Sequence, residues 1–293
     1  MAHKAGFVNI IGYPNVGKST LMNALVGEKL SIITQKAQTT RHRIMGIVNE
    51  DDYQIVFSDT PGIVRDPSYK MHEFMNKYIA SALSDADIML LMTEAGLKFQ
   101  EDDIIEKLKL SNTSVIVIIN KIDLSDQEKI AEEIIYWEEK IPGSNVVPVS
   151  ALESFNLQRV FDLILDALPE SPPYYDKDAF TDRSMRFFVS EIIREKVLLN
   201  YKKEIPYSVE VVVDAYKEEE NIVRIATTIF VVRESQKAIM LGHQGNAIKK
   251  TATQARKDME IFIGKKVFLE TTIKVKKDWR DSENLLKRFG YDH

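Results

Sequence analysis

The sequence predicts a doubly wound, mostly parallel α/β sheet followed by a smaller α+β domain. Short apolar, β-rich runs alternate with segments of helical periodicity over the first 168 residues. The runs lie at 6–11, 43–49, 53–58, 88–93, 114–119 and 145–149, and the helical segments at 70–84, 100–110, 126–140 and 156–168. Strands that alternate with helices are typical of a parallel sheet with helices on both faces.

The pattern changes after a segment rich in proline. Pro169, Pro172 and Pro173 fall in a stretch without periodicity, and proline at this density opposes helix and sheet alike. We therefore predict a first domain over 1–168, a linker over 169–183 and a second domain over 184–293.

The second domain is predicted to have an α-β-β-α-α-β order. A helical segment at 184–200 precedes two alternating strands, which begin at Tyr207 and Val223 and are joined by an acidic turn at 217–221. A glycine-containing turn, a long helix and a strand at 266–276 complete the order.

Composition excludes several kinds of function. The chain has no cysteine, which rules out disulfides, cysteine-ligated zinc and thiol catalysis. Its first residues, MAHKAGFVNIIG, lack the apolar core of a signal peptide, and no apolar run reaches the ~20 residues that span a bilayer. We expect a cytoplasmic protein.

Charge is unevenly divided along the chain. Residues 1–180 hold 17 Lys+Arg against 27 Asp+Glu, a net of -10, whereas residues 181–293 hold 22 against 17, a net of +5. Within 233–280 the count is 12 against 5. A basic second domain indicates a polyanionic partner.

The first motif is a phosphate-binding loop. Gly12-Tyr13-Pro14-Asn15-Val16-Gly17-Lys18-Ser19 fits G-x-x-x-x-G-K-[ST] and lies between a predicted strand and a predicted helix. Main-chain N–H groups of such a loop and the helix N-terminus bind phosphate oxygens. The predicted nucleotide ligands here are Asn15, Val16, Gly17, Lys18, Ser19 and Thr20.

Two further segments predict a magnesium site beside this loop. Asp59-Thr60-Pro61-Gly62 ends a strand, so that Asp59 can hold Mg²⁺ and the Gly62 N–H can sense a γ-phosphate. Gln38-Thr39-Thr40-Arg41-His42 lies between the two motifs. We predict Ser19, Thr40 and Asp59 as metal ligands and Lys18, Thr40 and Gly62 as the catalytic groups.

A guanine site is predicted at the next two strand ends. Asp123 in Asn120-Lys121-Ile122-Asp123 can accept hydrogen bonds from both N–H donors of guanine, which adenine lacks. Asn120 would brace the loop, the Lys121 stem would lie over the base, and Ser150-Ala151 would offer an N–H to the guanine O6. GTP or GDP with Mg²⁺ is the predicted ligand.

One position predicts slow hydrolysis. Ile63 follows the DTPG motif where Ras-like GTPases carry the glutamine that orients the attacking water. Because isoleucine cannot hydrogen-bond water, the water must be positioned by main chain, by residues 31–42 or by a partner.

An RNA site is predicted around the Gly242-His243-Gln244-Gly245 turn. An apolar helix end precedes the turn and a basic helix follows it, as in the KH module, whose glycine turn clamps the backbone of about four nucleotides. The predicted RNA-binding residues are Ile239, Gly242, His243, Gln244, Gly245, Lys249, Lys250 and Arg256. This chain has His243 and Gln244 inside the turn, where the family that the whole chain resembles often has lysine.

The whole chain resembles the Era family of bacterial ribosome-assembly GTPases. The likeness is carried by GYPNVGKS, QTTRH, DTPG, NKID and VSA, together with ESQKAIMLGHQG, KVKKDWR and LLKRFGY. The resemblance implies a P-loop GTPase domain followed by a type II KH domain. It also implies binding to the 3′ end of 16S ribosomal RNA, a role in assembly of the small ribosomal subunit, a monomeric state and peripheral association with the inner membrane.

Two alternatives stay open from the residues alone. The chain could be a GTPase that regulates a protein or membrane partner, with the second domain as an interaction module. It could instead be a passive RNA-binding protein whose nucleotide site only stabilises the fold. Salt-sensitive RNA binding argues against the first, and GTP turnover by the pure protein against the second.

Overall fold

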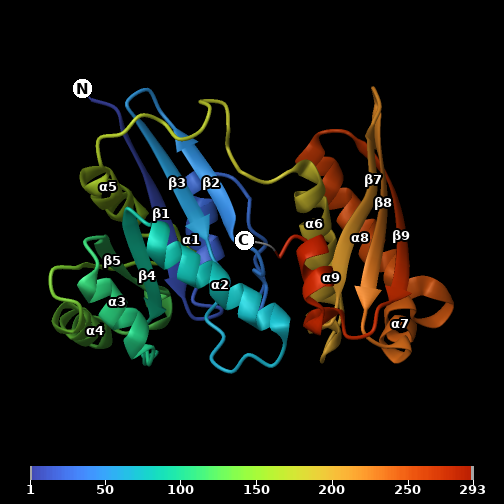
Figure 1. The fold of residues 1–293 in the computed structure, drawn as a ribbon, viewed down its shortest axis with the longest axis horizontal. Coiled ribbons are helices and arrows are strands. Elements are labelled where there is room, and N and C mark those ends of the chain that lie inside the picture. The colour runs from blue at the N-terminus through green and yellow to red at the C-terminus, as the bar shows by residue number, and fades with distance from the viewer. Residues whose placement is uncertain (1, 292–293) are drawn as a thin grey trace. The chain divides into compact units, whose positions relative to one another are not determined.

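The computed structural model describes residues 2–291 and divides into two compact units (Figure 1). Of the described residues, 2–31, 40–66 and 75–182 form the first unit, and 32–39, 67–74 and 183–291 form the second. Two short segments of the N-terminal half therefore belong with the second unit.

The first unit is built on a six-stranded sheet of order β2-β3-β1-β4-β5-β6. Strand β2 runs antiparallel to β3, and the other pairs are parallel, as predicted. The strands are β1 (Lys4–Gly12), β2 (Ile44–Asn49), β3 (Tyr53–Asp59), β4 (Ile88–Glu94), β5 (Ser114–Asn120) and β6 (Asn145–Pro148). The helices are α1 (Lys18–Val26), α2 (Lys70–Asp85), α3 (Asp102–Leu110), α4 (Gln127–Lys140) and α5 (Leu157–Ala167), with a short 3-10 helix η1 (Ile122–Leu124).

Strand register brings the sequence motifs to one edge of this sheet. Ile10 pairs with Asp59, and Asn120 pairs with Glu94. The central strands are buried on both faces, as their uninterrupted apolar runs require. The motifs therefore follow the carboxyl ends of neighbouring strands, where open α/β sheets bind ligands.

The second unit has the predicted α-β-β-α-α-β order (Figure 1). Strands β7 (Glu210–Glu218) and β8 (Ile222–Val231) are antiparallel, and β9 (Lys266–Val275) lies parallel to β8. The helices are α6 (Met185–Asn200), α7 (Glu234–Leu241), α8 (Asn246–Ile263) and α9 (Glu283–Arg288), and the 3-10 helices are η2 (Ile205–Tyr207), η3 (His243–Gly245) and η4 (Trp279–Asp281).

The core of the second unit joins one face of α6 to the sheet and to α8. Val189, Ile193 and Val197 recur every four residues along α6 and pack with Ile225 of β8 and Met259 of α8. The C-terminal segment is part of this unit, since Trp279, Leu286 and Tyr291 are fully buried. Apolar residues at helical and strand spacing thus account for the domain's assembly.

The first strand of this unit differs from the prediction. Tyr207 lies in η2, because Pro206 at its start fixes φ and favours a turn over a strand. A β-bulge between Val213 and Ala215 then shifts the alternation. Ala215 is exposed as a result, and Tyr216 packs against the core instead.

The predicted linker is largely held against the first unit. Glu170 bridges to Lys4, the main-chain N–H groups of Tyr174 and Tyr175 donate to Gln54 Oε1 at 2.7 and 3.0 Å, and Thr181 bridges to Gly46. We call residues 170–182 the strap. The strap ends with the last residue of the first unit, Asp182, and the second unit continues from Arg183.

Within the described residues, no helix is long and apolar enough to cross a membrane.

Candidate functional site

The phosphate loop lies between the end of β1 and the start of α1. Its backbone has positive φ angles at Asn15 (65°) and at Gly17 (104°), which directly precedes the helix. Asn15 is exposed, Val16 is buried, and Thr20 is half-buried in the first turn of α1. Gly62 approaches so closely that an added Cβ would come within 2.7 Å of Pro14. Only glycine allows the DTPG segment to lie this near the loop.

The three predicted metal ligands lie together. Ser19 Oγ donates to Asp59 Oδ2 at 2.6 Å, and Thr40 Oγ1 lies 2.9 Å from Ser19 Oγ and 3.3 Å from Asp59 Oδ2. Asp59 is fully buried, and its Oδ1 has no hydrogen-bond partner among residues 2–291. A buried carboxylate oxygen without a donor, beside two hydroxyls, is a set of hard oxygen ligands that fits Mg²⁺.

Electrostatics at this point favour an incoming anion and cation together. Lys18 is buried and donates to the carbonyls of Gly12 and Tyr13 at 3.1 and 2.8 Å. Burial lowers the pKa of Lys18 to about 8, although the nearby Asp59 charge opposes this shift. Burial also raises the pKa of Asp59, against the hydrogen bond from Ser19 and the charge of Lys18. Phosphate at the amine and a cation at the carboxylate would each stabilise the charged form.

Asn120 joins three of the predicted loops. Its Nδ2 donates to the Val16 carbonyl at 2.8 Å, and its Oδ1 accepts from the Ala151 N–H at 2.9 Å. The side chain is 3% exposed, so the brace that the sequence predicted is present. The Ala151 N–H is used in this brace, and its predicted contact with a guanine O6 stays a prediction.

The other predicted guanine residues follow the ends of β5 and β6. Asp123 is exposed in η1, and Ser150 is buried directly after β6. Lys121 has a left-handed backbone (φ 62°) and forms an ion pair with Glu94. Asp123 therefore stands available to a ligand, while Lys121 is already positioned by a carboxylate.

Sequence reasoning missed one cluster next to the phosphate loop. Tyr13 Oη donates to Glu101 at 2.8 Å, and Arg65 donates to the same carboxylate at 2.8 Å while stacking 4.6 Å from the Tyr13 ring. Ile63, two residues before Arg65, is 8% exposed. The cluster fixes the segment after DTPG against the loop. Tyr13 and Glu101 are 88 residues apart in the sequence, so no local sequence pattern indicates the cluster.

The glycine turn of the second unit has the backbone that a KH clamp needs. Gly242, Gln244 and Gly245 have φ values of 68°, 52° and 75°. A Cβ on Gly242 would come 2.7 Å from the Ala247 Cβ, whereas one on Gly245 would meet open space. The Met240 carbonyl before the turn accepts a hydrogen bond from Tyr201 Oη at 2.8 Å. The hydrogen bond from Tyr201 thus fixes the chain before the turn, and the space beside Gly245 is open.

Most of the side chains predicted to bind RNA are exposed around the turn. His243, Gln244, Lys249 and Lys250 are exposed, and Ile239 is 54% exposed despite being apolar. Arg256 differs, because it donates to Glu260 at 2.7 Å one helical turn later. Among the predicted lysines and arginine, Lys249 and Lys250 are therefore the exposed cations that a polyanion could contact.

Both units match known domain families. Residues 7–121 match the family described as 50S ribosome-binding GTPase, and residues 204–280 match the KH domain family. GTPase Era of Syntrophus aciditrophicus (strain SB) is 46% identical over 293 residues, covering 99% of this chain and 95% of that protein. GTPase Era of Clostridium kluyveri is 43% identical over 291 residues, covering 98% and 99%.

The chain belongs to the Era family of GTPases. Two solved Era structures are similar over 99% of the chain and the whole of the other molecule. One is Era in complex with MgGDPNP and nucleotides 1506–1542 of 16S ribosomal RNA, with a TM-score of 0.94 and 37% identity. The other is an Aquifex aeolicus Era variant bound to GDP.AlF4-, with a TM-score of 0.92 and 36% identity. The fold and the GTPase activity predicted from the sequence are confirmed as those of the Era family.

Proposed function

We propose that this GTPase uses its nucleotide state to control binding of the KH domain to the 3′ end of 16S ribosomal RNA during assembly of the small ribosomal subunit. The observation that carries the proposal is the likeness to an Era structure that holds both MgGDPNP and 16S nucleotides 1506–1542. The open, positive-φ glycine turn flanked by Lys249 and Lys250 supports the RNA half.

The nucleotide half rests on the ligands described above. When bound, Mg²⁺ would supply charge neutralisation between the β- and γ-phosphates. Ser19, Thr40 and Asp59 would hold it, and Lys18 would move its ammonium from main-chain carbonyls to phosphate oxygens. Asp123 would select guanine, because an adenine would leave its carboxylate without a donor pair.

Hydrolysis in this proposal is slow without a partner. Ile63 offers no side-chain hydrogen bond to water, so only main chain and residues 31–42 are left to orient the nucleophile. An RNA or ribosomal partner that orders this segment would accelerate turnover. A long-lived GTP-bound state is the useful consequence, since it gives time for RNA to bind.

The test is an RNA titration in two nucleotide states. A single-stranded RNA from the 3′ end of 16S ribosomal RNA is titrated into protein with GDP and into protein with a non-hydrolysable GTP analogue, at matched salt. We expect RNA to bind the analogue-bound form about 5–150-fold more tightly, the range of ordinary coupling between sites. Equal affinities would show two independent modules, and absence of RNA binding would favour a protein or membrane partner.

Monomeric state and peripheral membrane association are part of the same proposal as implied by the resemblance. Sedimentation of the pure protein tests the first. Flotation with anionic vesicles, at low and at physiological salt, tests the second, because attraction of the basic second domain to lipid would be screened by salt.

A further inference from the structure

The segment that directly precedes a predicted magnesium ligand, Thr40, belongs to the second unit. Residues 32–39 belong to that unit, and the first unit resumes at Thr40. Hydroxyl groups fold the segment on itself, since Thr34 Oγ1 and Thr39 Oγ1 lie 2.6 Å apart and Thr39 Oγ1 donates to the Lys36 carbonyl at 2.6 Å. The residue that reaches toward Ser19 and Asp59 is therefore the direct continuation of a loop that helix α6 contacts.

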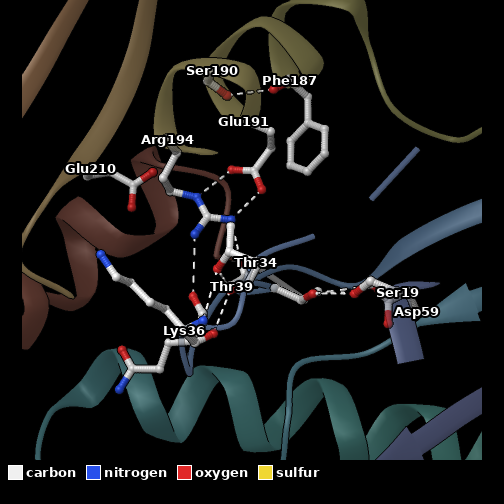
Figure 2. Close-up of polar contacts among 12 residues, drawn as sticks. Ser19, Thr34, Lys36, Thr39, Asp59, Phe187, Ser190, Glu191, Arg194 and Glu210 are labelled. Atoms are coloured by element: carbon white, nitrogen blue, oxygen red, sulfur yellow. Dashed lines mark hydrogen bonds and ion pairs between the residues drawn. The ribbon is translucent and has the colours of Figure 1, made fainter. Parts of the chain in front are cut away.

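Arg194 of α6 and Lys36 of the loop each donate hydrogen bonds across this contact, and Figure 2 shows those from Arg194 to the loop. Arg194 of α6 donates to the carbonyls of Gln38, at 3.4 Å, and Thr39. Lys36 of the loop donates to the carbonyls of Leu198 and, at 2.5 Å, Tyr201, at the C-terminal end of α6. Carbonyls at a helix end lack intrahelical donors, so Lys36 satisfies groups that need a partner.

Glu191 fixes the orientation of Arg194. It lies one turn earlier on α6 and accepts from Arg194 Nε at 2.7 Å and from a second guanidinium nitrogen. The side chains of Arg194 and Glu191 are 1% and 7% exposed. A two-point pair holds the guanidinium in one plane and leaves its remaining N–H groups aimed at the loop carbonyls.

The energetics indicate a role in geometry rather than in stability. A buried ion pair contributes little net stability compared with apolar residues of similar volume, because desolvation offsets the attraction. Both carbonyls that it holds belong to the two residues before Thr40. Fixing them in advance removes ordering entropy that a ligand would otherwise have to overcome.

We propose that Glu191, Arg194 and Lys36 form a clamp by which the second unit positions Thr40 for magnesium and the γ-phosphate. Arg194 and Lys36 are positioning residues that do not touch the nucleotide. This inference rests on the proposed function, because it assigns to Thr40 the metal contact. Its consequence is that the second unit contributes to GTP recognition through the main chain of residues 36–39.

The test removes both partners of the Glu191–Arg194 pair together, and the buried Glu210, which also interacts with Arg194, keeps its hydrogen bond from Tyr291. The double variant Glu191→Leu, Arg194→Met replaces the ion pair by apolar side chains of similar size, which buried pairs tolerate. Lys36→Met removes the opposite contact, and Arg194→Lys keeps the charge but lacks the fork that reaches two carbonyls. Arg186→Met is the matched control, because Arg186 lies on α6 but donates to Val213 of β7.

The measurements are affinity for a non-hydrolysable GTP analogue, affinity for GDP, and the Mg²⁺ concentration that gives half-maximal turnover, all in the full-length protein. We expect the double variant and Lys36→Met to lose roughly 10- to 100-fold in analogue affinity, as when supports of metal ligands are removed. They should also need more Mg²⁺, while GDP affinity matches wild type. Arg194→Lys should fall between, and Arg186→Met should equal wild type.

Three outcomes overturn the clamp. Unchanged analogue affinity and Mg²⁺ dependence in both clamp variants would show that the contact is only structural, as would equal losses for GDP and the analogue. Faster turnover would show that the contact restrains Thr40 instead. Failure of the wild type itself to bind the analogue with Mg²⁺ would instead refute the proposed function, so the two failures are distinguishable.

Discussion

Asn120→Ala should lower both the free energy of unfolding of the nucleotide-free protein and its affinity for GDP. The substitution removes the partners of two buried main-chain groups, the Val16 carbonyl and the Ala151 N–H. Each unsatisfied buried group costs about 1–3 kcal/mol, so the free energy of unfolding should fall by roughly 2–6 kcal/mol. Urea unfolding without nucleotide measures this loss. Titration with a fluorescent GDP measures the accompanying loss of affinity, which follows because the three loops no longer hold one another.

Asn49→Ala is the matched control for this experiment. Asn49 also makes two hydrogen bonds, to the Ala179 carbonyl at 2.7 Å and from Gln54 Nε2 at 2.6 Å, but lies away from the nucleotide loops. It should lose stability with no change in GDP affinity. The reasoning fails if Asn120→Ala loses less than about 1 kcal/mol and binds GDP like the wild type.

Three more predictions follow from the two sites. Burial lowers the pKa of Lys18 to about 8 in the folded protein, whereas the ordinary pKa of lysine is 10.5. Between these two pH values the unfolded chain binds the proton that the folded chain has lost, so the free energy of unfolding of the nucleotide-free protein should rise with pH by at most about 1.4 kcal/mol per pH unit. Unfolding at pH 8 and pH 10 should show this gain in the wild type but not in Lys18→Met. Asp123→Asn should weaken GTP binding and favour xanthosine nucleotides, which competition titrations check, and unchanged GTP preference would contradict the assignment. Gly245→Asp should abolish RNA binding in filter or anisotropy assays and spare intrinsic GTP turnover, whereas Gly245→Asn, which carries the same backbone strain without the charge, should bind RNA more tightly than Gly245→Asp.

The motifs could be predicted because each is a local backbone shape at the end of a strand. Gly12 to Ser19, Asp59 and Asn120 each follow an apolar run whose parallel partners fix where it ends. The pattern places the ends of strands less accurately. Tyr207 begins the alternation of apolar residues but lies in η2, because Pro206 fixes φ and favours a turn there. The pattern alone gave the correct order of elements in both units.

The contacts between distant segments could not be predicted in this way. Glu191 and Arg194 are charged residues in a helical sequence, and their spacing is equally typical of a solvated helix face. Only packing around α6 buries both side chains and directs Arg194, held by Glu191, toward the carbonyls of residues 38 and 39. The Tyr13, Arg65 and Glu101 cluster depends in the same way on tertiary structure, and so does the course of the strap.

The strap also bears on aggregation. Strand β2 lies at the edge of the six-stranded sheet, and an uncovered edge offers its main-chain groups to strands of other molecules. Residues of the strap occupy these groups: the Ile47 N–H donates to the Phe180 carbonyl at 3.0 Å, and the Met45 carbonyl accepts from Thr181 at 2.7 Å. A GTPase fragment cut after Asp182 keeps this cover. One cut after Leu168 exposes β2 as a template for intermolecular pairing.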